Sequence, residues 1–172
     1  MDYNVVIKER FSCRKFKDVL IEKKDLIEIL EAGRIAPTAM NYQPFKIYVL
    51  ESDEALEKLD SLTHCRYNAK IVLLFTYDIN LDWKNPLEKG VHSGIEDVSI
   101  VATHIMLKAR DLGIDSCWCN YFSTTKIEET FNLPENEKSV LIMPLGYKDD
   151  SCVISPMHDK KKELEEIVKY IW

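Results

Sequence analysis

The chain has 172 residues, of which 46% are hydrophobic and 30% are charged, and its formal net charge is −6. This composition predicts one globular domain over residues 1–172 with a sizeable core. The acidic balance argues against nucleic-acid binding, and the longest apolar run, residues 71–75, is far shorter than the roughly 20 residues that cross a bilayer.

In the first half of the chain, helical and strand patterns alternate. We expect a short helix over 5–10, a helix over 25–33, a strand over 45–50, a helix over 53–59 after an N-cap at Ser52, and a strand over 70–77.

The second half begins with a loop over 78–90, rich in turn residues. A long helix over 91–112 follows, with Gly113 at its C′ position and apolar residues on more than one side. We then expect a strand over 116–121, a helix over 125–131, a strand over 139–145 and an amphipathic tail over 160–172. This order predicts an α+β fold with a mixed central sheet flanked by helices.

The first polar motif is an alternation of Arg10, Ser12 and Arg14. On an extended backbone these side chains would point to one side, and two guanidiniums with a hydroxyl suit a phosphate. The alternative is a solvated turn with surface arginines.

The second motif lies between Pro37 and Pro44 and carries Asn41 and Gln43. Amide side chains donate and accept hydrogen bonds, which suits the edge of a heterocycle. The alternative is a loop whose prolines merely end the preceding helix. Taken together, the two motifs predict a site for a nucleotide-like cofactor.

Four phrases, in this order, resemble the FMN-dependent nitroreductase family. They are Arg-x-Ser-x-Arg-x-Phe at 10–16, Ala-Pro-Thr-x-x-Asn-x-Gln-Pro at 36–44, the segment 94–118 and the segment 133–147. The resemblance covers nearly the whole chain and implies a short member of the family, with an intertwined homodimer and FMN as cofactor.

The resemblance also implies roles for particular residues. Arg10, Ser12 and Arg14 would hold the FMN phosphate and the ribityl end or pyrimidine edge. The segment with Pro37, Thr38, Asn41 and Gln43 would reach the flavin of the other subunit, Thr38 keeping the hydroxyl of the serine usual there. The remaining candidates are Cys117, Trp118 and Asn120 beside the flavin and Lys160 and Lys161 on the phosphate.

Some positions depart from the family pattern. Tyr121 stands where many relatives have glycine, and the 78–90 loop is short where many have an insertion over the substrate. A more open pocket is therefore expected. Arg14 is the first candidate for the charge beside the reduced ring, and Arg66 is the second.

No metal site is expected. Cys117 and Cys119 would share one face of a strand, but no second cysteine or histidine pair lies near them, and zinc needs four ligands. The five cysteines also lack the spacing of a disulfide framework, and residues 1–4 lack the features of an export signal, so a cytoplasmic protein is expected.

The expected reaction is hydride transfer from NAD(P)H through flavin N5 to a nitroaromatic, a quinone or a similar small acceptor. No catalytic side chain is assigned, because the flavin carries the chemistry. The alternatives are a flavin-sequestering or regulatory module with little turnover, and a relative with dehalogenase or flavin-fragmenting chemistry. The acceptor and the choice between NADH and NADPH stay open.

Overall fold

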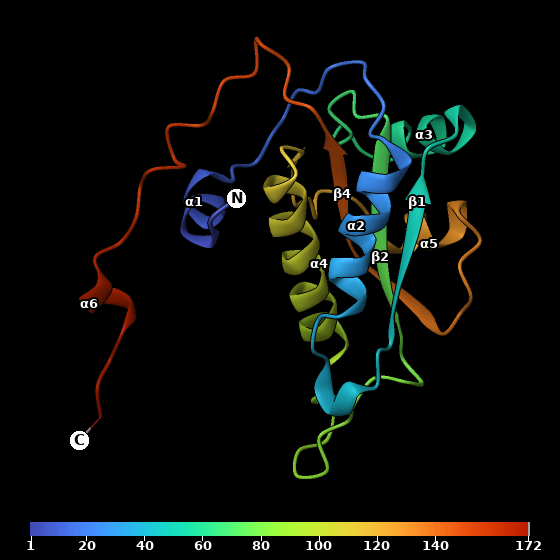
Figure 1. Cartoon of the computed structure of the whole chain (residues 1–172). Helices are drawn as coiled ribbons and strands as arrows, with labels where there is room; N and C mark the ends of the chain where they lie inside the picture. The colour runs from blue at the N-terminus through green and yellow to red at the C-terminus, as the bar shows by residue number, and fades with distance from the viewer. Residues whose placement is uncertain (172) are drawn as a thin grey trace.

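The computed structural model describes residues 1–171, and its centre is an antiparallel sheet in the order β1-β2-β4-β3 (Figure 1). The strands are β1 Phe45–Leu50, β2 Ile71–Asp78, β3 Asp115–Ser116 and β4 Glu137–Gly146. All eight residues of β2 are buried, which explains its unbroken apolar run. The expected α+β fold is confirmed, and the parallel part of the sheet is a single bridge between Ser12 and Ser116.

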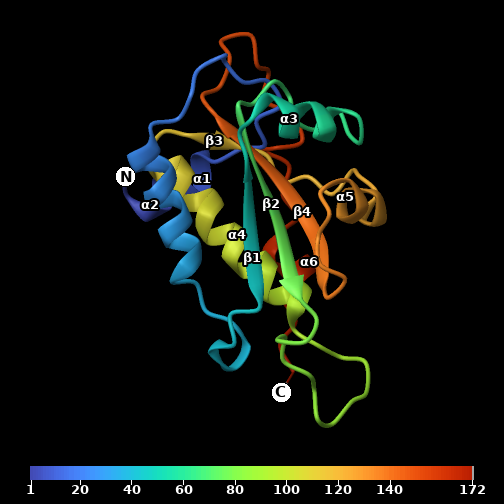
Figure 2. The same ribbon diagram turned by 90° about the vertical axis from the view of Figure 1, so that its right-hand side faces the viewer.

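Helices cover both faces of the sheet (Figure 2). On one face, α2 Lys23–Arg34 and α4 Gly94–Asp111 enclose the larger core, which includes Ile29, Leu73, Phe75, Val101 and Ile105. On the other face, α3 Asp53–Asp60 and α5 Thr124–Thr130 enclose a smaller core with Leu59, Leu74, Ile127 and Ile142. The N-terminal helix α1, Tyr3–Glu9, lies beside α4.

Two predicted boundaries are wrong. The long helix begins at Gly94 rather than at residue 91, because His92 first pairs with Lys84 in a β-bridge. The strand expected over 116–121 is regular only through Ser116, and then touches β4 again at Cys119. Pro144 of β4 explains the interruption, since it accepts from the Cys117 N–H but has no N–H to return.

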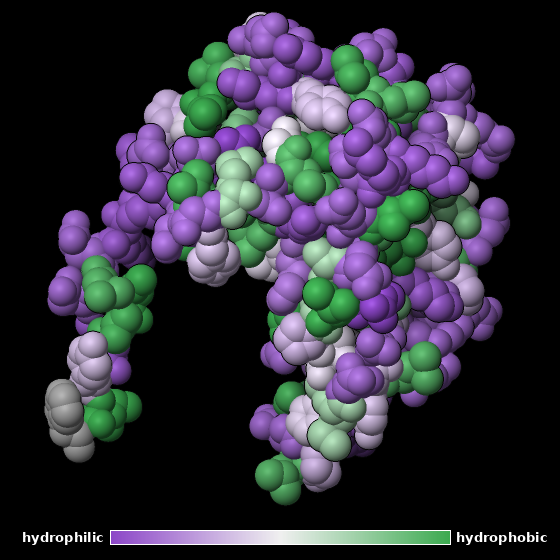
Figure 3. Space-filling view, in the orientation of Figure 1, coloured by the Kyte–Doolittle hydropathy of each residue, from purple (hydrophilic) through white to green (hydrophobic). Residues whose placement is uncertain are grey.

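The C-terminal tail, which we define as residues 147–171 after β4, is mostly without regular structure. Only α6, Leu164–Ile167, is helical, and Leu164 and Ile167 are more than half exposed. A helix this short is unstable unless it packs on something, and Figure 3 shows the tail standing apart from the body. The amphipathic tail expected over 160–172 therefore contains only one helical turn within the described residues, and Trp172 lies outside them.

Across residues 1–171, no helix combines the length and the apolar character needed to cross a membrane.

Gly94 gives a test of the packing at the start of α4. A Cβ on Gly94 would lie 2.2 Å from Cδ2 of Tyr77, a buried residue of β2. Glycine to alanine usually stabilises a helix, but here the clash should win, and Gly94→Ala should lower the free energy of unfolding by about 1–3 kcal/mol. Urea denaturation measures this, with exposed Glu96→Ala as the control. A Gly94→Ala protein as stable as the wild type would contradict the packing.

Candidate functional site

A cavity of about 270 Å³ lies between the segment that follows α1 and the C-terminal tail. Its lining is mostly polar, with three cationic side chains, and comprises Arg10, Phe11, Ser12, Arg14, Ile154, Ser155, Met157, His158 and Lys161. The structure therefore brings the first sequence motif together with one of the two tail lysines. Lys160 does not line this cavity.

The segment 10–14 is held in an extended form at the edge of the sheet. The Cys13 N–H donates to the Ser116 carbonyl at 2.9 Å, and Ser12 forms the parallel bridge with Ser116. Phe11 and Cys13 are buried, whereas Arg10, Ser12 and Arg14 face the cavity. The alternation seen in the sequence thus places all three polar side chains on one side of the segment, and we call residues 10–14 the clamp segment.

The charges of the clamp segment have no counterion within the described chain. Arg34, Arg66 and Arg110 each pair with a carboxylate. Among residues 1–171, no carboxylate forms an ion pair with Arg10 or Arg14. Two guanidiniums that share a polar cavity in this way could bind an anion, because their fork of donors matches phosphate or carboxylate oxygens.

Arg66 is a different case. Its guanidinium makes two bonds to Asp60, at 2.8 and 2.6 Å, and a third to the Ala69 carbonyl at 3.1 Å. These bonds use both faces of the donor fork that a ligand would need. The Asp60 carboxylate offsets the charge of Arg66, so the geometry does not favour a role for Arg66 beside a bound ring, and that role stays a prediction.

Cys117 lies under the clamp segment. The pKa of its thiol is lowered by a hydrogen bond with Cys119, and then by the charge of Arg14 and the hydroxyl of Ser12. Burial opposes this shift. Of the three candidates on this segment, Cys117 is the one that the structure brings to Arg14.

Trp118 and Asn120 are bound to each other. The Trp118 Nε1–H donates to Oδ1 of Asn120 at 2.7 Å, and the Asn120 amide donates to the Val140 carbonyl, also at 2.7 Å. Asn120 lines another cavity, together with Tyr121. Its amide thus fixes the Trp118 ring against β4, and the structure does not bring Asn120 to the clamp segment.

The second sequence motif forms an exposed loop around the short 3-10 helix η1, Ala39–Asn41. Met40, Asn41 and Gln43 all have a positive φ, at 53°, 58° and 49°. Side-chain-bearing residues reach this region at an energetic cost, and such strain gathers at functional sites. The Thr38 hydroxyl accepts from the Gln43 N–H at 3.0 Å and so stabilises the turn.

This loop and the clamp segment lie at opposite ends of the sheet in both ribbon views, the loop at the lower end (Figures 1 and 2). One chain therefore does not bring the two motifs together. They can meet only if a second subunit brings its own loop to the clamp segment.

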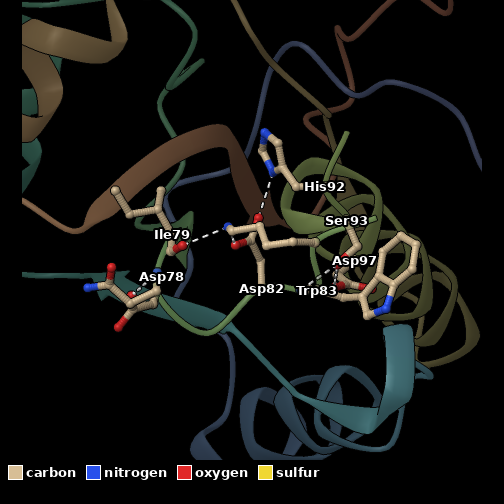
Figure 4. A network of polar contacts seen from close by, with 9 residues as sticks. Asp78, Ile79, Asp82, Trp83, His92, Ser93 and Asp97 are labelled. Atoms are coloured by element: carbon tan, nitrogen blue, oxygen red, sulfur yellow. Dashed lines mark hydrogen bonds and ion pairs between the residues drawn. The ribbon is translucent and has the colours of Figure 1, made fainter. Parts of the chain in front are cut away.

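Asp97, near the start of α4, anchors the loop. One oxygen of its buried carboxylate accepts from the Ala39 N–H at 2.8 Å, and the other accepts from the Ser93 hydroxyl at 2.7 Å. Ser93 in turn accepts from the Trp83 N–H at 3.2 Å. As Figure 4 shows, this side chain links the helix to the neighbouring 78–93 loop.

The 78–93 loop carries a second buried carboxylate, Asp82. It contacts Nδ1 of His92 at 2.6 Å and pairs with Lys84, whose Nζ also donates to the Ile79 carbonyl at 2.7 Å (Figure 4). The loop is therefore short but well held. Asp82 and Asp97 were not among the sequence candidates, although an aspartate beside Val98 on the apolar face of a helix is a usable signal.

The Nitroreductase family model matches residues 7–69 and 65–147. The chain belongs to the nitroreductase family. A nitroreductase family protein of Clostridium difficile has 35% identity and a TM-score of 0.91, covering 99% of this chain and 98% of that one. A relative from Archaeoglobus fulgidus, named for NADH dehydrogenase and NAD(P)H nitroreductase activity, is 31% identical over 152 residues, 84% of each chain.

A third protein of the same fold comes from Exiguobacterium sibiricum and was solved in complex with FMN. It shares 21% identity with this chain, with a TM-score of 0.84 and coverage of 99% and 98%. Within residues 1–171, no group of three or more histidine, cysteine or acidic side chains is arranged to hold a metal ion.

Removing the Asp97 carboxylate should release the loop around η1. Asp97→Ala leaves the Ala39 N–H and the Ser93 hydroxyl without their acceptor, which should cost about 2–4 kcal/mol of unfolding free energy. Hydrogen exchange should rise at residues 38–43, while Glu96→Ala, the neighbouring exposed acid, leaves it unchanged. Unchanged protection in Asp97→Ala would show that the carboxylate does not hold the loop.

Proposed function

We propose that the protein is an FMN-dependent oxidoreductase that passes a hydride from NAD(P)H to a small aromatic acceptor, such as a nitroaromatic or a quinone. Membership of the nitroreductase family supports the general reaction. The main support for the cofactor is that Arg10 and Arg14 line one polar cavity and form no ion pair within residues 1–171. An FMN complex of a protein with the same fold supports the choice of flavin.

The residues present fit the phosphate end of FMN. Arg10, Ser12, Arg14 and Lys161 offer charged and hydroxyl donors on a cavity of about 270 Å³. That volume suits a phosphate and its neighbouring atoms rather than a whole flavin, so the ring would extend beyond the cavity. Within residues 1–171, the lining of this cavity offers a single anion site, so an adenosine extension would lack a partner there, which favours FMN over FAD.

A homodimer with two shared flavin sites would complete the ring pocket. In it, Pro37, Thr38, Asn41 and Gln43 of one subunit would meet the clamp segment of the other. Exposed apolar residues support such an assembly, namely Val5 and Ile7 on α1, Ile95 and Ile100 on α4, and Leu164, Ile167 and Val168 on the tail. Apolar surface of this extent usually marks an interaction site.

When bound, the flavin supplies the hydride chemistry, so the chain needs to bind, orient and exclude water. The amides of Asn41 and Gln43 would donate to and accept from the polar edge of the ring. Arg14 would stabilise negative charge on the reduced ring. The short 78–93 loop, held by Asp82, would leave room for acceptors of different shape.

Arginine substitutions test the phosphate site. Arg10→Ala and Arg14→Ala should each remove a charge-assisted interaction of about 1.5–3 kcal/mol. FMN affinity should then fall roughly ten- to a hundredfold. Lys15→Ala is the matched control, because its Nζ donates to Ser151 at 2.5 Å, away from the cavity lining. Fluorescence titrations in which the three variants lose affinity equally would contradict the assignment.

The purified protein itself tests the reaction. We expect a yellow protein that releases FMN, not FAD, on denaturation, and that oxidises NAD(P)H faster when a nitroaromatic or quinone is added. Chromatography of the chromophore and steady-state absorbance measure the two parts. Bound FMN without acceptor-dependent turnover would favour a flavin-sequestering module, and FAD or no flavin after reconstitution would refute the proposal.

A further inference from the structure

Two thiols from distant parts of the chain lie in contact behind the clamp segment. The Sγ atoms of Cys13 and Cys152 are 3.9 Å apart, although the residues are 139 positions apart in sequence. Cys13 is fully buried between the cavity-facing side chains of Ser12 and Arg14. Cys152 stands where the C-terminal tail begins, and it is the one cysteine of the five that is not buried.

The backbone around both thiols is fixed by hydrogen bonds. The Asp149 N–H donates to the Lys15 carbonyl at 3.0 Å, and the Cys152 N–H donates to the Asp149 carbonyl at 2.9 Å. Lys15 also donates to the Ser151 hydroxyl. A disulfide needs sulfurs about 2.05 Å apart, so the two Sγ atoms, which are 3.9 Å apart, must approach by roughly 1.9 Å for the bond to form.

The other three cysteines are placed differently. Cys65, Cys117 and Cys119 are all buried in the smaller core of the sheet. An oxidant that arrives from solvent therefore meets Cys152 first, and Cys13 is the thiol beside it. Accessibility and proximity together single out this pair.

We propose that Cys13 and Cys152 form a reversible disulfide in the presence of a hydroperoxide, and that this bond fixes the base of the C-terminal tail to the clamp segment. The inference is independent of the reaction proposed above, except where it concerns flavin retention.

The chemistry proceeds in two balanced steps. Cys152 gives its thiol proton to solvent, and its thiolate attacks the peroxide: an S–O bond forms, the O–O bond breaks, and the leaving oxygen takes up a proton from solvent and departs as an alcohol or water. The Cys13 sulfur then displaces the hydroxyl of the sulfenic acid, the S–S bond forms, and the Cys13 proton leaves with that hydroxyl as water. Two thiols lose two electrons in total, and the peroxide gains them.

Burial accounts for the division of roles. It raises the pKa of the Cys13 thiol to about 12, although the hydrogen bond to the Lys15 carbonyl opposes the shift. Since the thiolate is the reactive form, Cys13 is protected from direct oxidation and acts as the resolving thiol.

The bond would act on the cavity through the tail. The cavity is lined opposite Arg10 and Arg14 by residues that follow Cys152 at two to nine positions along the chain, namely Ile154, Ser155, Met157, His158 and Lys161. A tail tied down at Cys152 keeps Lys161 close to the anion. If FMN occupies the cavity, as proposed above, the oxidised protein should release it more slowly.

The test treats FMN-loaded protein with hydrogen peroxide, blocks the remaining thiols and digests it without reduction. Mass spectrometry should find a peptide linking Cys13 to Cys152 that dithiothreitol separates. Release of FMN should be roughly three- to tenfold slower in the oxidised wild type than in the reduced one, as for a tethered contact. Cys152→Ser should abolish both effects, and Cys65→Ser should leave both.

Oxidation of Cys152 to sulfinic acid without a linked peptide would overturn the disulfide. A linked peptide with unchanged FMN release would overturn its effect on the cavity. A wild-type protein that binds no FMN would refute the proposed function and the retention effect together, while the linked peptide would still decide whether the disulfide forms.

Discussion

Main-chain hydrogen bonding beside β3 and β4 holds the whole candidate site together. The clamp segment donates from Cys13 to the Ser116 carbonyl, and a little further on Lys17 donates to the Tyr147 carbonyl at 2.8 Å. After β4 the chain returns to this segment, and the Asp149 N–H donates to the Lys15 carbonyl. Because these bonds use only backbone groups, the side chains are free to alternate between core and cavity. These backbone hydrogen bonds place Arg10, Ser12 and Arg14 on one side of the clamp segment. They also bring Cys117 close to it and fix where the tail begins.

The positive charge of the cavity depends on which arginines the fold leaves without an ion-pair partner within residues 1–171. The chain has a net charge of −6, and carboxylates are available to most of its cations. Arg34 and Arg66 are each held by an acid three or six residues away in sequence. Glu9, the acid next to the clamp segment, pairs instead with Arg110 at 2.9 Å. Arg10 is partly buried and Arg14 is exposed, so their like charges lie close together on one cavity, and a bound anion would offset their repulsion.

Most helices and strands could be predicted from the sequence, because their periodicity is local. The burial of β2 and the alternation at residues 10–14 are read directly from neighbouring side chains. Other features depend on partners far along the chain. The bond from Ala39 to Asp97 spans 58 positions, and the break in the 116–121 strand depends on Pro144 opposite it. Neither leaves a periodic signal. The tail forms only one helical turn for another reason. Its apolar residues Leu164 and Ile167 are exposed and do not pack against the body of the subunit.

The three left-handed residues of the second motif have a consequence for how this sequence can change. Met40, Asn41 and Gln43 hold a conformation that glycine adopts without steric cost. Replacement by glycine would therefore relax the backbone of the loop, and would remove the exposed amides of Asn41 and Gln43, which we propose bind the flavin. Selection for a more stable fold should thus favour glycine at these positions, whereas selection for ligand binding should favour the amides. Variants chosen only for heat resistance should accumulate glycine here and lose their ligand, whereas natural variation under selection for activity should keep the strained amides.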